Sequence, residues 1–277
     1  MRQKIRQIGQ IRPGREPKAP TKSTNVADYQ FVPRPVTAMA KEFDDGATSG
    51  MHHHPRAQLL YCVSGVMEVL ADRAVWLVPP QRAVWIPPDL HHEMRCRGHV
   101  SLRTVYVKPD AVPVSFPGAP AIVRVSPLLR ELILRAVAMP NLYDENGHDG
   151  KIVDLILNEF FWEQESLLTM QQPTDRRLQR IYKHLLKAPD DVLTLENWAT
   201  RLGVSSRTLA RLVQTETGTS FTLWRQQIRL LTALPRLALG EPVIDVAMAV
   251  GYDTPSAFAA MFRRFTGTTP ARYFKSA

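Results

Sequence analysis

The chain has 277 residues, enough for two ordinary domains. Of these residues 44% are hydrophobic and 22% charged, a composition typical of folded proteins. It lacks a run of about 18 apolar residues, which argues against a membrane span, and its basic start lacks the apolar stretch of a secretory signal. Two cysteines, Cys62 and Cys96, are too few for a disulfide framework. We therefore expect a soluble cytoplasmic protein.

The net charge of +9 is unevenly distributed along the chain. Residues 1–30 carry seven Lys/Arg against two acids, residues 31–174 carry thirteen against sixteen, and residues 175–277 carry fifteen against eight. The two ends are basic, which favours a polyanionic partner because Lys and Arg bound to phosphates release condensed counterions. Charge alone is weak evidence, since many basic proteins bind no nucleic acid.

Residues 1–30 are rich in Arg, Lys, Pro and Thr and have no hydrophobic periodicity. This composition predicts a disordered tail. A basic arm that adds non-specific DNA affinity is the functional alternative.

Residues 31–118 consist of short apolar runs separated by Pro and Gly, a pattern that predicts a small β-sandwich or barrel. Gly65, Pro79-Pro80, Pro87-Pro88 and Gly98 are expected in the connections. The predicted strands are 58–63, 66–70, 74–78, 83–86 and 102–107.

Histidines give this region its chemical character. His52 and His54 alternate, so on one strand both would face the same side; with Gln58 and the later His92 they resemble the two motifs of the cupin superfamily, which is built on small β-barrels. The resemblance implies an interior effector site made by these four residues. Trp85 is expected in the core, but it lies near the second motif and is retained as a candidate effector contact.

Three interpretations of the histidines remain open. They bind an effector directly without a required metal, which we favour; or His52, His54 and His92 hold zinc, nickel or iron(II); or they are structural. Two departures from the cupin pattern weaken the metal interpretation, because neutral Gln58 stands where a Glu is usual and Asp89 replaces a turn glycine. His53 and His91 are expected to point the other way.

Residues 119–174 are expected to be a helical dimerisation and linker region. Ser126 followed by proline marks the start of one helix, which stops at Pro140. A second helix is predicted over Lys151–Glu165, and residues 166–174 resemble a linker. Homodimerisation through the second helix is the corresponding prediction.

From Asp175 onward the chain is expected to be helical, and two stretches share one pattern. With Gly203 aligned on Gly251, Ala199 coincides with Ala247. Closely crossing helices need a small residue at the contact, and the sharp turn between them needs a positive φ, which glycine adopts. Short polar residues then cap the next helices: Ser205 or Ser206 in the first stretch, Asp253 or Thr254 in the second.

This pattern predicts two helix-turn-helix units whose second helices enter the major groove. Arg207 and Arg211 can each donate bidentate hydrogen bonds to guanine, worth about 1–3 kcal/mol of discrimination. The two glycines are 48 positions apart, a spacing that permits two reading helices about one turn of DNA apart. Solvated arginines on ordinary amphipathic helices are the structural alternative.

The whole of residues 175–277 resembles the AraC/XylS family of transcription regulators, most specifically in the run from Gly251 to Tyr273. The resemblance implies base contacts from the first unit; the second unit, with few hydrogen-bonding side chains, is expected to contribute phosphate and apolar contacts. Pro235 is expected to kink the joining helix. The candidate DNA-binding residues are Ser206, Arg207, Ala210, Arg211, Thr254, Pro255, Ser256, Ala259, Arg263 and Arg264.

A cupin-like sensor ahead of paired helix-turn-helix units is a familiar layout in that family. We expect an α+β multidomain protein in which a cupin-like β-barrel precedes an all-α domain, with double-stranded DNA and a small-molecule effector as partners and no enzymatic activity. The alternative is a cupin-type metalloenzyme with an incidental helical C-terminal domain. Gln58 and the complete C-terminal signature argue against it.

Overall fold

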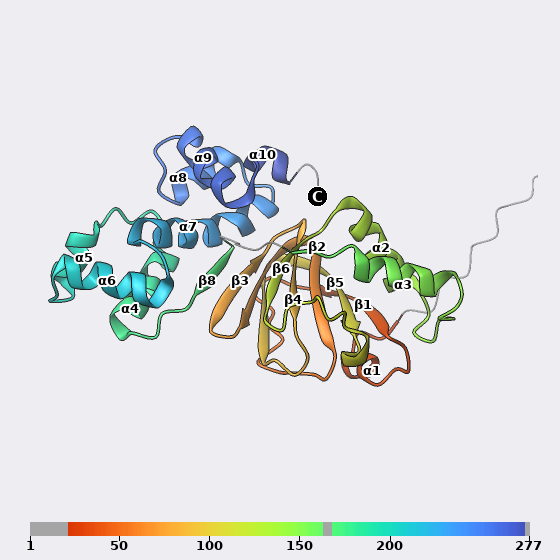
Figure 1. Ribbon diagram of the computed structural model, residues 1–277. Helices are drawn as coiled ribbons and strands as arrows, with labels where there is room; N and C mark the ends of the chain where they lie inside the picture. The colour runs from red at the N-terminus through yellow and green to blue at the C-terminus, as the bar shows by residue number, and fades with distance from the viewer. Residues whose placement is uncertain (1–21, 163–167, 275–277) are drawn as a thin grey trace, which may run out of the picture.

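The computed structural model describes residues 22–162 and 168–274. A sheet-rich N-terminal domain occupies the centre of Figure 1. Helices α2 (Pro127–Ala138) and α3 (His148–Asn158) lie at one side of it, and an all-helical C-terminal domain lies at the other. No helix in the described ranges is long and apolar enough to span a membrane.

The N-terminal domain is an eight-stranded antiparallel sheet ordered β1-β5-β2-β4-β6-β7, with β3 joining β2 to β8. The long strands β2 and β5 pair from Ala57 opposite Val107 to Ala71 opposite His92. Among the described residues the path does not close into a ring, so the domain is a curled, cupin-like sheet rather than a closed barrel. The strands are β1 (Val36–Phe43), β2 (Ala57–Ala71), β3 (Ala74–Val78), β4 (Arg82–Ile86), β5 (His92–Val107), β6 (Ala121–Arg124), β7 (Phe161–Trp162) and β8 (Thr169–Gln171).

The prediction that Gly65 and Gly98 lie in connections was wrong, because they lie inside β2 and β5. Both have positive φ, 80° and 73°, and the β2–β5 register shifts next to Gly65. A Cβ at Gly65 would lie 2.3 Å from the His99 carbonyl oxygen. These glycines therefore mark irregularities within long strands, where the chain needs backbone freedom and close approach.

The region 119–174 is only partly helical. Helix α2 (Pro127–Ala138) begins as predicted, with the Ser126 hydroxyl accepting from the Leu129 amide, but α3 spans His148–Asn158. The prediction of a helix through Glu165 was wrong for residues 159–162, and residues 163–165 lie outside the described ranges. Trp162, in β7, pairs with Val123 of β6, and its ring centroid lies 4.9 Å from that of Phe116. Strands β6 and β8 also lie in this region.

The prediction of a disordered tail over residues 1–30 was wrong for residues 27–30. Residues 1–21 lie outside the described ranges, but helix α1 (Ala27–Gln30) follows them. Tyr29 is fully buried and stacks on Tyr106 at 6.1 Å between ring centroids. A composition average over 30 residues conceals this one aromatic anchor.

The two faces of the sheet pack into separate cores. One face, with Ala83 and Trp85, packs beneath α2 and α3. The other, with Leu60, Val84 and Ile86, encloses the interior of the curled sheet. This division follows from the alternation of side chains along each strand.

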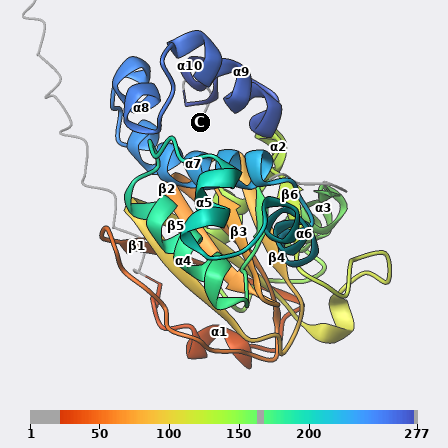
Figure 2. The same ribbon diagram turned by 90° about the vertical axis from the view of Figure 1, so that its left-hand side faces the viewer.

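The C-terminal domain is helical throughout, as expected. Its longest helix, α7 (Phe221–Ala238), continues through Pro235; in Figure 2 it lies below the helices formed by residues 243–273 and above the helices formed by residues 176–217. Its core includes Val66 and Leu77 of the sheet, so the two domains share buried surface. The helices are α4 (Arg176–Lys187), α5 (Leu195–Arg201), α6 (Ser206–Thr217), α7 (Phe221–Ala238), α8 (Val243–Ala249), α9 (Pro255–Thr266) and α10 (Pro270–Tyr273).

Candidate nucleic-acid interface and ligand pocket

Helices α5 and α6 form the first predicted helix-turn-helix unit. Gly203 in the turn has φ of 67°, and Ala199 is buried at the helix crossing. Of the two candidate caps, Ser205 is the one used: its hydroxyl accepts from the Thr208 amide at 3.2 Å. These features confirm the predicted turn chemistry.

Helices α8 and α9 repeat the arrangement. Gly251 has φ of 81°, and Ala247 is fully buried. Thr254 is the cap, accepting from the Ala257 amide at 3.2 Å, and Pro255 occupies the first helical position. The second unit is therefore also a helix-turn-helix.

The second helix of each unit, α6 or α9, buries its apolar face and exposes the opposite face. Leu209 and Val213 are buried in α6, as are Phe258 and Phe262 in α9. Of the ten predicted DNA-binding residues, Ser206 and Ala259 are half-buried and the other eight are exposed. Arg207, Arg211, Arg263 and Arg264 form no ion pair with any carboxylate in the described part of the chain.

Sequence reasoning missed Arg229, which connects the two units. This α7 residue donates from Nε to the Pro189 carbonyl at 2.9 Å, in the loop before α5. Its guanidinium also lies 5.2 Å from the ring centroid of Tyr252, in the turn of the second unit. Only its position on the joining helix could have suggested this role.

A cavity of about 260 Å³ opens into the interior of the curled sheet. Its walls combine apolar residues with a few polar groups, and Lys41 is the charged residue among its lining. No acidic side chain lines it. The lining residues are Val26, Met39, Lys41, Phe43, Thr48, Ser49, His52, Gln58, Leu60, His92, Met94, Leu102 and Tyr106.

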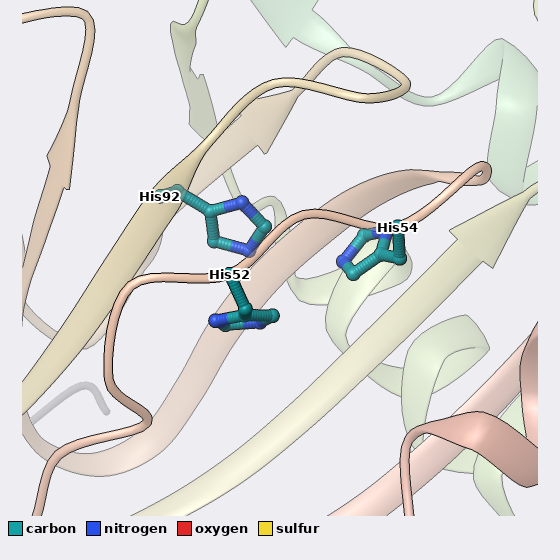
Figure 3. Close-up of side chains that lie close together, drawn as sticks. All are labelled: His52, His54 and His92. Carbon is teal, nitrogen blue, oxygen red and sulfur yellow. The ribbon is translucent and has the colours of Figure 1, made fainter.

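The structure brings His52, His54 and His92 together (Figure 3), and His52 and His92 line this cavity. The His92 ring centroid is 4.4 Å from that of His52 and 5.1 Å from that of His54. The prediction that His52 and His54 lie on one strand was wrong. They lie in the segment before β2, where His52 forms an isolated bridge with His92. This bridge, rather than strand alternation, aligns the cluster.

Gln58 lies at the centre of the cluster. Its side-chain oxygen is 3.1 Å from Nε2 of both His54 and His92, and its amide nitrogen is 2.9 Å from the Thr104 hydroxyl and 3.2 Å from the Tyr106 hydroxyl. Gln58 and His92 are buried. The predicted partnership of Gln58 with the histidines is therefore present.

The histidine rings are electrostatically suited to the neutral state. Burial lowers the pKa of His92 to about 4, with the neighbouring histidines adding to the effect. Burial also lowers the pKa of His54. Both rings are therefore neutral at pH 7.

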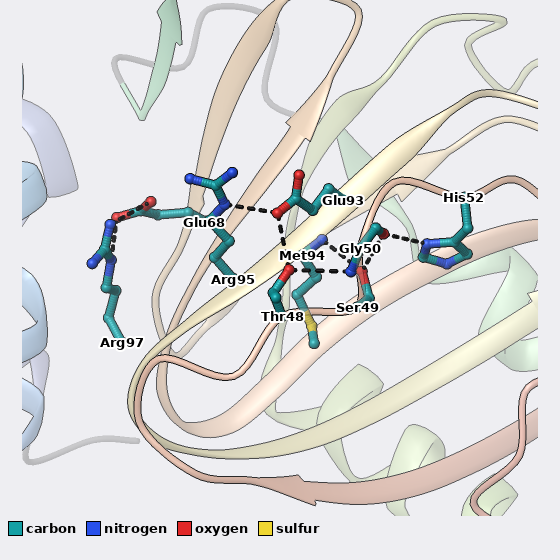
Figure 4. Close-up of polar contacts among 9 residues, drawn as sticks. All are labelled: Thr48, Ser49, Gly50, His52, Glu68, Glu93, Met94, Arg95 and Arg97. Carbon is teal, nitrogen blue, oxygen red and sulfur yellow. Dashed lines mark hydrogen bonds and ion pairs between the residues drawn. The ribbon is translucent and has the colours of Figure 1, made fainter.

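Hydrogen bonds to β5 hold the segment that carries His52 (Figure 4). The Ser49 amide donates to the Met94 carbonyl at 3.0 Å, and the Ser49 hydroxyl accepts from the Met94 amide at 2.9 Å. His52 Nδ1 in turn lies 2.9 Å from the Gly50 carbonyl oxygen. The backbone thus orients the ring without any acidic partner.

Trp85 does not belong to this site. It is fully buried on the opposite face of the sheet, where its ring packs against Phe116 at 5.2 Å. Because side chains alternate along β4, Trp85 points away from the interior face that carries Ile86. His53 and His91 also lie outside the cluster, as predicted; both are exposed and pack on each other at 4.5 Å.

Cupin-like domains can hold a divalent metal, so the donor set bears on that possibility. The three imidazoles have donor atoms within 4.8 Å of one another, but the fourth group is the Gln58 amide. A dication here would meet four neutral donors and Lys41 in the same cavity wall, with no carboxylate to balance its charge. These residues do not fit a metal centre.

Two family models match the chain. The AraC-like ligand binding domain model matches residues 36–198, and a helix-turn-helix domain model matches residues 198–276. The HTH-type transcriptional regulator NimR of Escherichia coli K12 is 33% identical over 229 residues, which are 83% of each chain. The regulator RipA of Corynebacterium glutamicum is 37% identical over 101 residues, 36% of this chain and 30% of RipA.

Solved structures include similar chains. The DNA-binding domain of AdpA, in complex with a target DNA, is 28% identical, covers 37% of this chain and 93% of its own, and has a TM-score of 0.35. Unsaturated fatty acid bound ToxT from Vibrio cholerae is 10% identical, covers 86% of this chain and 94% of its own, and has a TM-score of 0.36.

Proposed function

The chain belongs to the AraC family of transcriptional regulators, with a ligand-binding domain before a helix-turn-helix DNA-binding domain, and on that premise we propose which surfaces bind DNA and effector. Helices α6 and α9 read successive major grooves of one DNA face. The interior cavity of the curled sheet takes the effector. The protein acts in the cytoplasm, where a regulator reaches its chromosome.

The exposed arginines of α6 and α9 support the DNA surface. Arg207 and Arg211 are one helical turn apart and exposed, a spacing that brings both to one groove. Arg263 and Arg264 are exposed near the end of α9 and suit phosphate contacts. The C-terminal region, fifteen basic against eight acidic residues, adds the long-range attraction.

The main support for the effector site is the cluster of polar groups in a cavity whose other walls are largely apolar. Ligand pockets typically combine apolar walls with a few placed polar groups. Here Lys41 supplies a positive charge and His52 a ring nitrogen, with no acid in the lining. A small, partly apolar molecule with an anionic group matches this chemistry, and no metal is required to hold it.

Homodimerisation through α3 is part of the proposal. Leu155 of α3 and Leu128 of α2 are about half exposed, at 48% and 51%, which offers apolar surface beside the sheet. Light scattering at micromolar concentration tests this directly. A monomer at that concentration would contradict it.

The central experiment is binding of the purified protein to DNA from its own upstream region, titrated against salt with random duplex as competitor. Specific binding with a steep salt slope is the expected result. Small organic acids and their neutral amides are then compared for their effect on the operator Kd. Loss of both specific binding and any ligand effect would contradict the regulator assignment of these surfaces.

A further inference from the structure

The hydrogen-bonding directions of the three histidine rings are set by the backbone. Nδ1 of His52, His54 and His92 lies 2.9, 2.7 and 2.9 Å from the carbonyl oxygens of Gly50, Arg56 and Leu90, respectively. A carbonyl oxygen only accepts, so each Nδ1 carries the proton. His54 and His92 are buried and neutral at pH 7, and a neutral ring has one N–H, which leaves Nε2 of each of these two histidines as a lone pair.

Gln58 meets both of these lone pairs at once. If the amide oxygen faced the Nε2 atoms of His54 and His92, each of the two contacts, at 3.1 Å, would bring two hydrogen-bond acceptors together. The amide NH₂ has two hydrogens, one for each lone pair. A 180° turn about the last side-chain bond exchanges the two ends, which have nearly the same shape.

The other neighbours of the amide accept either orientation. The Thr104 and Tyr106 hydroxyls lie 2.9 and 3.2 Å from the far end of the Gln58 amide, and a hydroxyl can donate or accept. With the NH₂ toward the histidines, these hydroxyls donate to the amide oxygen. Every polar atom of the amide then has a partner, as a buried group requires.

We propose that Gln58 keeps the three-histidine cluster free of metal, because its amide hydrogens occupy the Nε2 lone pairs of His54 and His92 that a metal would need. Gln58, His54 and His92 thereby form a neutral hydrogen-bonded group. Within the described residues Nε2 of His52 has no hydrogen-bond partner, so it is the ring nitrogen open to the ligand. The inference rests on the proposed effector pocket, but its test uses neither DNA nor effector, so the two fail separately.

A carboxylate at this position would reverse the behaviour of the site. Gln58→Glu keeps the shape of the side chain, removes both donor hydrogens and adds a negative charge beside three imidazoles. An ionised carboxylate accepts only, so the Nε2 lone pairs of His54 and His92 would be released and a dication compensated. Gln58→Ala releases the lone pairs without adding charge.

The test compares metal binding by the full-length wild type, Gln58→Glu and Gln58→Ala after identical loading with Co²⁺ and gel filtration. Bound metal is measured by mass spectrometry and by the visible d–d bands of Co²⁺. We expect substoichiometric metal in the wild type and stoichiometric metal in Gln58→Glu, with an affinity gain of at least about tenfold, and an intermediate result for Gln58→Ala. The double variant Gln58→Glu/His92→Ala should lose the gain, which assigns the metal to this cluster.

Stoichiometric metal in the wild type, or no gain in folded Gln58→Glu, would overturn the proposal. A measurement on the wild type covers the case in which the variants do not fold. Nitrogen-15 NMR of the histidine rings at pH 7 should find pyridine-type Nε2 and protonated Nδ1 in His54 and His92. A protonated Nε2 in either ring would show that Gln58 accepts there, and would also overturn it.

Discussion

Single side chains on α6 and α9 divide the proposed DNA recognition unequally. Arg207 and Arg211 are exposed on α6 and can read guanine edges by bidentate hydrogen bonds. At the matching end of α9, Pro255 and Ala259 offer no hydrogen-bonding side chain. We therefore expect α6 to carry most direct base readout, and α9 to contribute phosphate contacts and shape.

Arg207→Ala and Arg211→Ala should each reduce the difference in binding free energy between operator and random DNA by about 1–3 kcal/mol, since each removes a base contact. Arg263→Ala should weaken both affinities together and reduce the salt slope. The measurement is a pair of binding titrations, operator and random duplex, at several salt concentrations. Arg124→Ala, an exposed arginine of β6, is the control; equal losses on both DNAs for Arg207→Ala would assign that residue to phosphate.

How far single residues could be predicted depended on whether their chemistry is local. The caps and turn glycines could be predicted because a cap bonds its own chain two or three residues later. Gln58 and the histidines were found from their resemblance to the cupin motifs, but Trp85, kept as a candidate effector contact, shows the limit of such reasoning. Which face of the sheet a strand residue occupies depends on register with partners far along the chain, such as Ala121 opposite Trp85.

At the scale of elements, the two helix-turn-helix units differ in what surrounds their turns. Gly203 has nothing within 4 Å of an added Cβ, whereas a Cβ at Gly251 would lie 2.5 Å from Arg229 Nη2 and 2.8 Å from the Asp190 Cα. The second turn is therefore packed against α7 and the loop before α5. The first turn is open to solvent. Substitutions at Gly203 therefore test the backbone conformation alone, whereas substitutions at Gly251 test both conformation and packing.

Gly203→Ala should cost about 1–2 kcal/mol of unfolding free energy, the price of a positive φ for a residue with a Cβ. Gly251→Ala should cost more, because a contact with backbone cannot be relieved by rotating a side chain. Urea unfolding of both variants measures the difference. Gly251→Ala should also lower the affinity for a full operator towards that for one whose second half is scrambled; equal unfolding costs for the two variants would contradict the packing argument.

Element type was predictable where periodicity is strong and uncertain where tertiary packing decides. The helices from Arg176 to Tyr273 have apolar spacing and capping signals close to their observed ends. By contrast, Phe161 and Trp162 continue the apolar pattern of α3 in sequence but form β7. The Trp162 ring packs into the core around Trp85, which a longer helix would not allow, and such a choice has no local signature.

On the scale of the whole molecule, the second helix-turn-helix unit is attached to the sensor domain. Tyr273 of α10 is buried and donates from its hydroxyl to the Pro80 carbonyl at 2.7 Å, while its own carbonyl accepts from Gln81 Nε2 at 3.1 Å. Gln227 of α7 makes a further bond to the Thr169 carbonyl at 3.3 Å. The sensor and the DNA-binding domain are thus joined by specific contacts as well as by shared apolar surface. No sequence pattern indicates the contacts of Tyr273, because its partners are nearly 200 residues away.

Tyr273→Phe should loosen this attachment while leaving the recognition helices intact. The ring keeps its packing against Phe262, at 5.6 Å between centroids, but the Pro80 carbonyl loses a buried donor, at a cost of about 1–3 kcal/mol. Hydrogen exchange should therefore accelerate at the amides of Gln81 and Arg82, which follow Pro80, with α6 and α9 unchanged. Tyr143→Phe is the matched control, because its hydroxyl accepts from the Val36 amide at 3.4 Å within the sensor domain. If Tyr273 transmits the state of the effector pocket to α9, the variant should also show a smaller change of operator Kd on effector binding. Unchanged exchange at the Gln81 and Arg82 amides would instead mean that shared apolar surface alone holds the domains together.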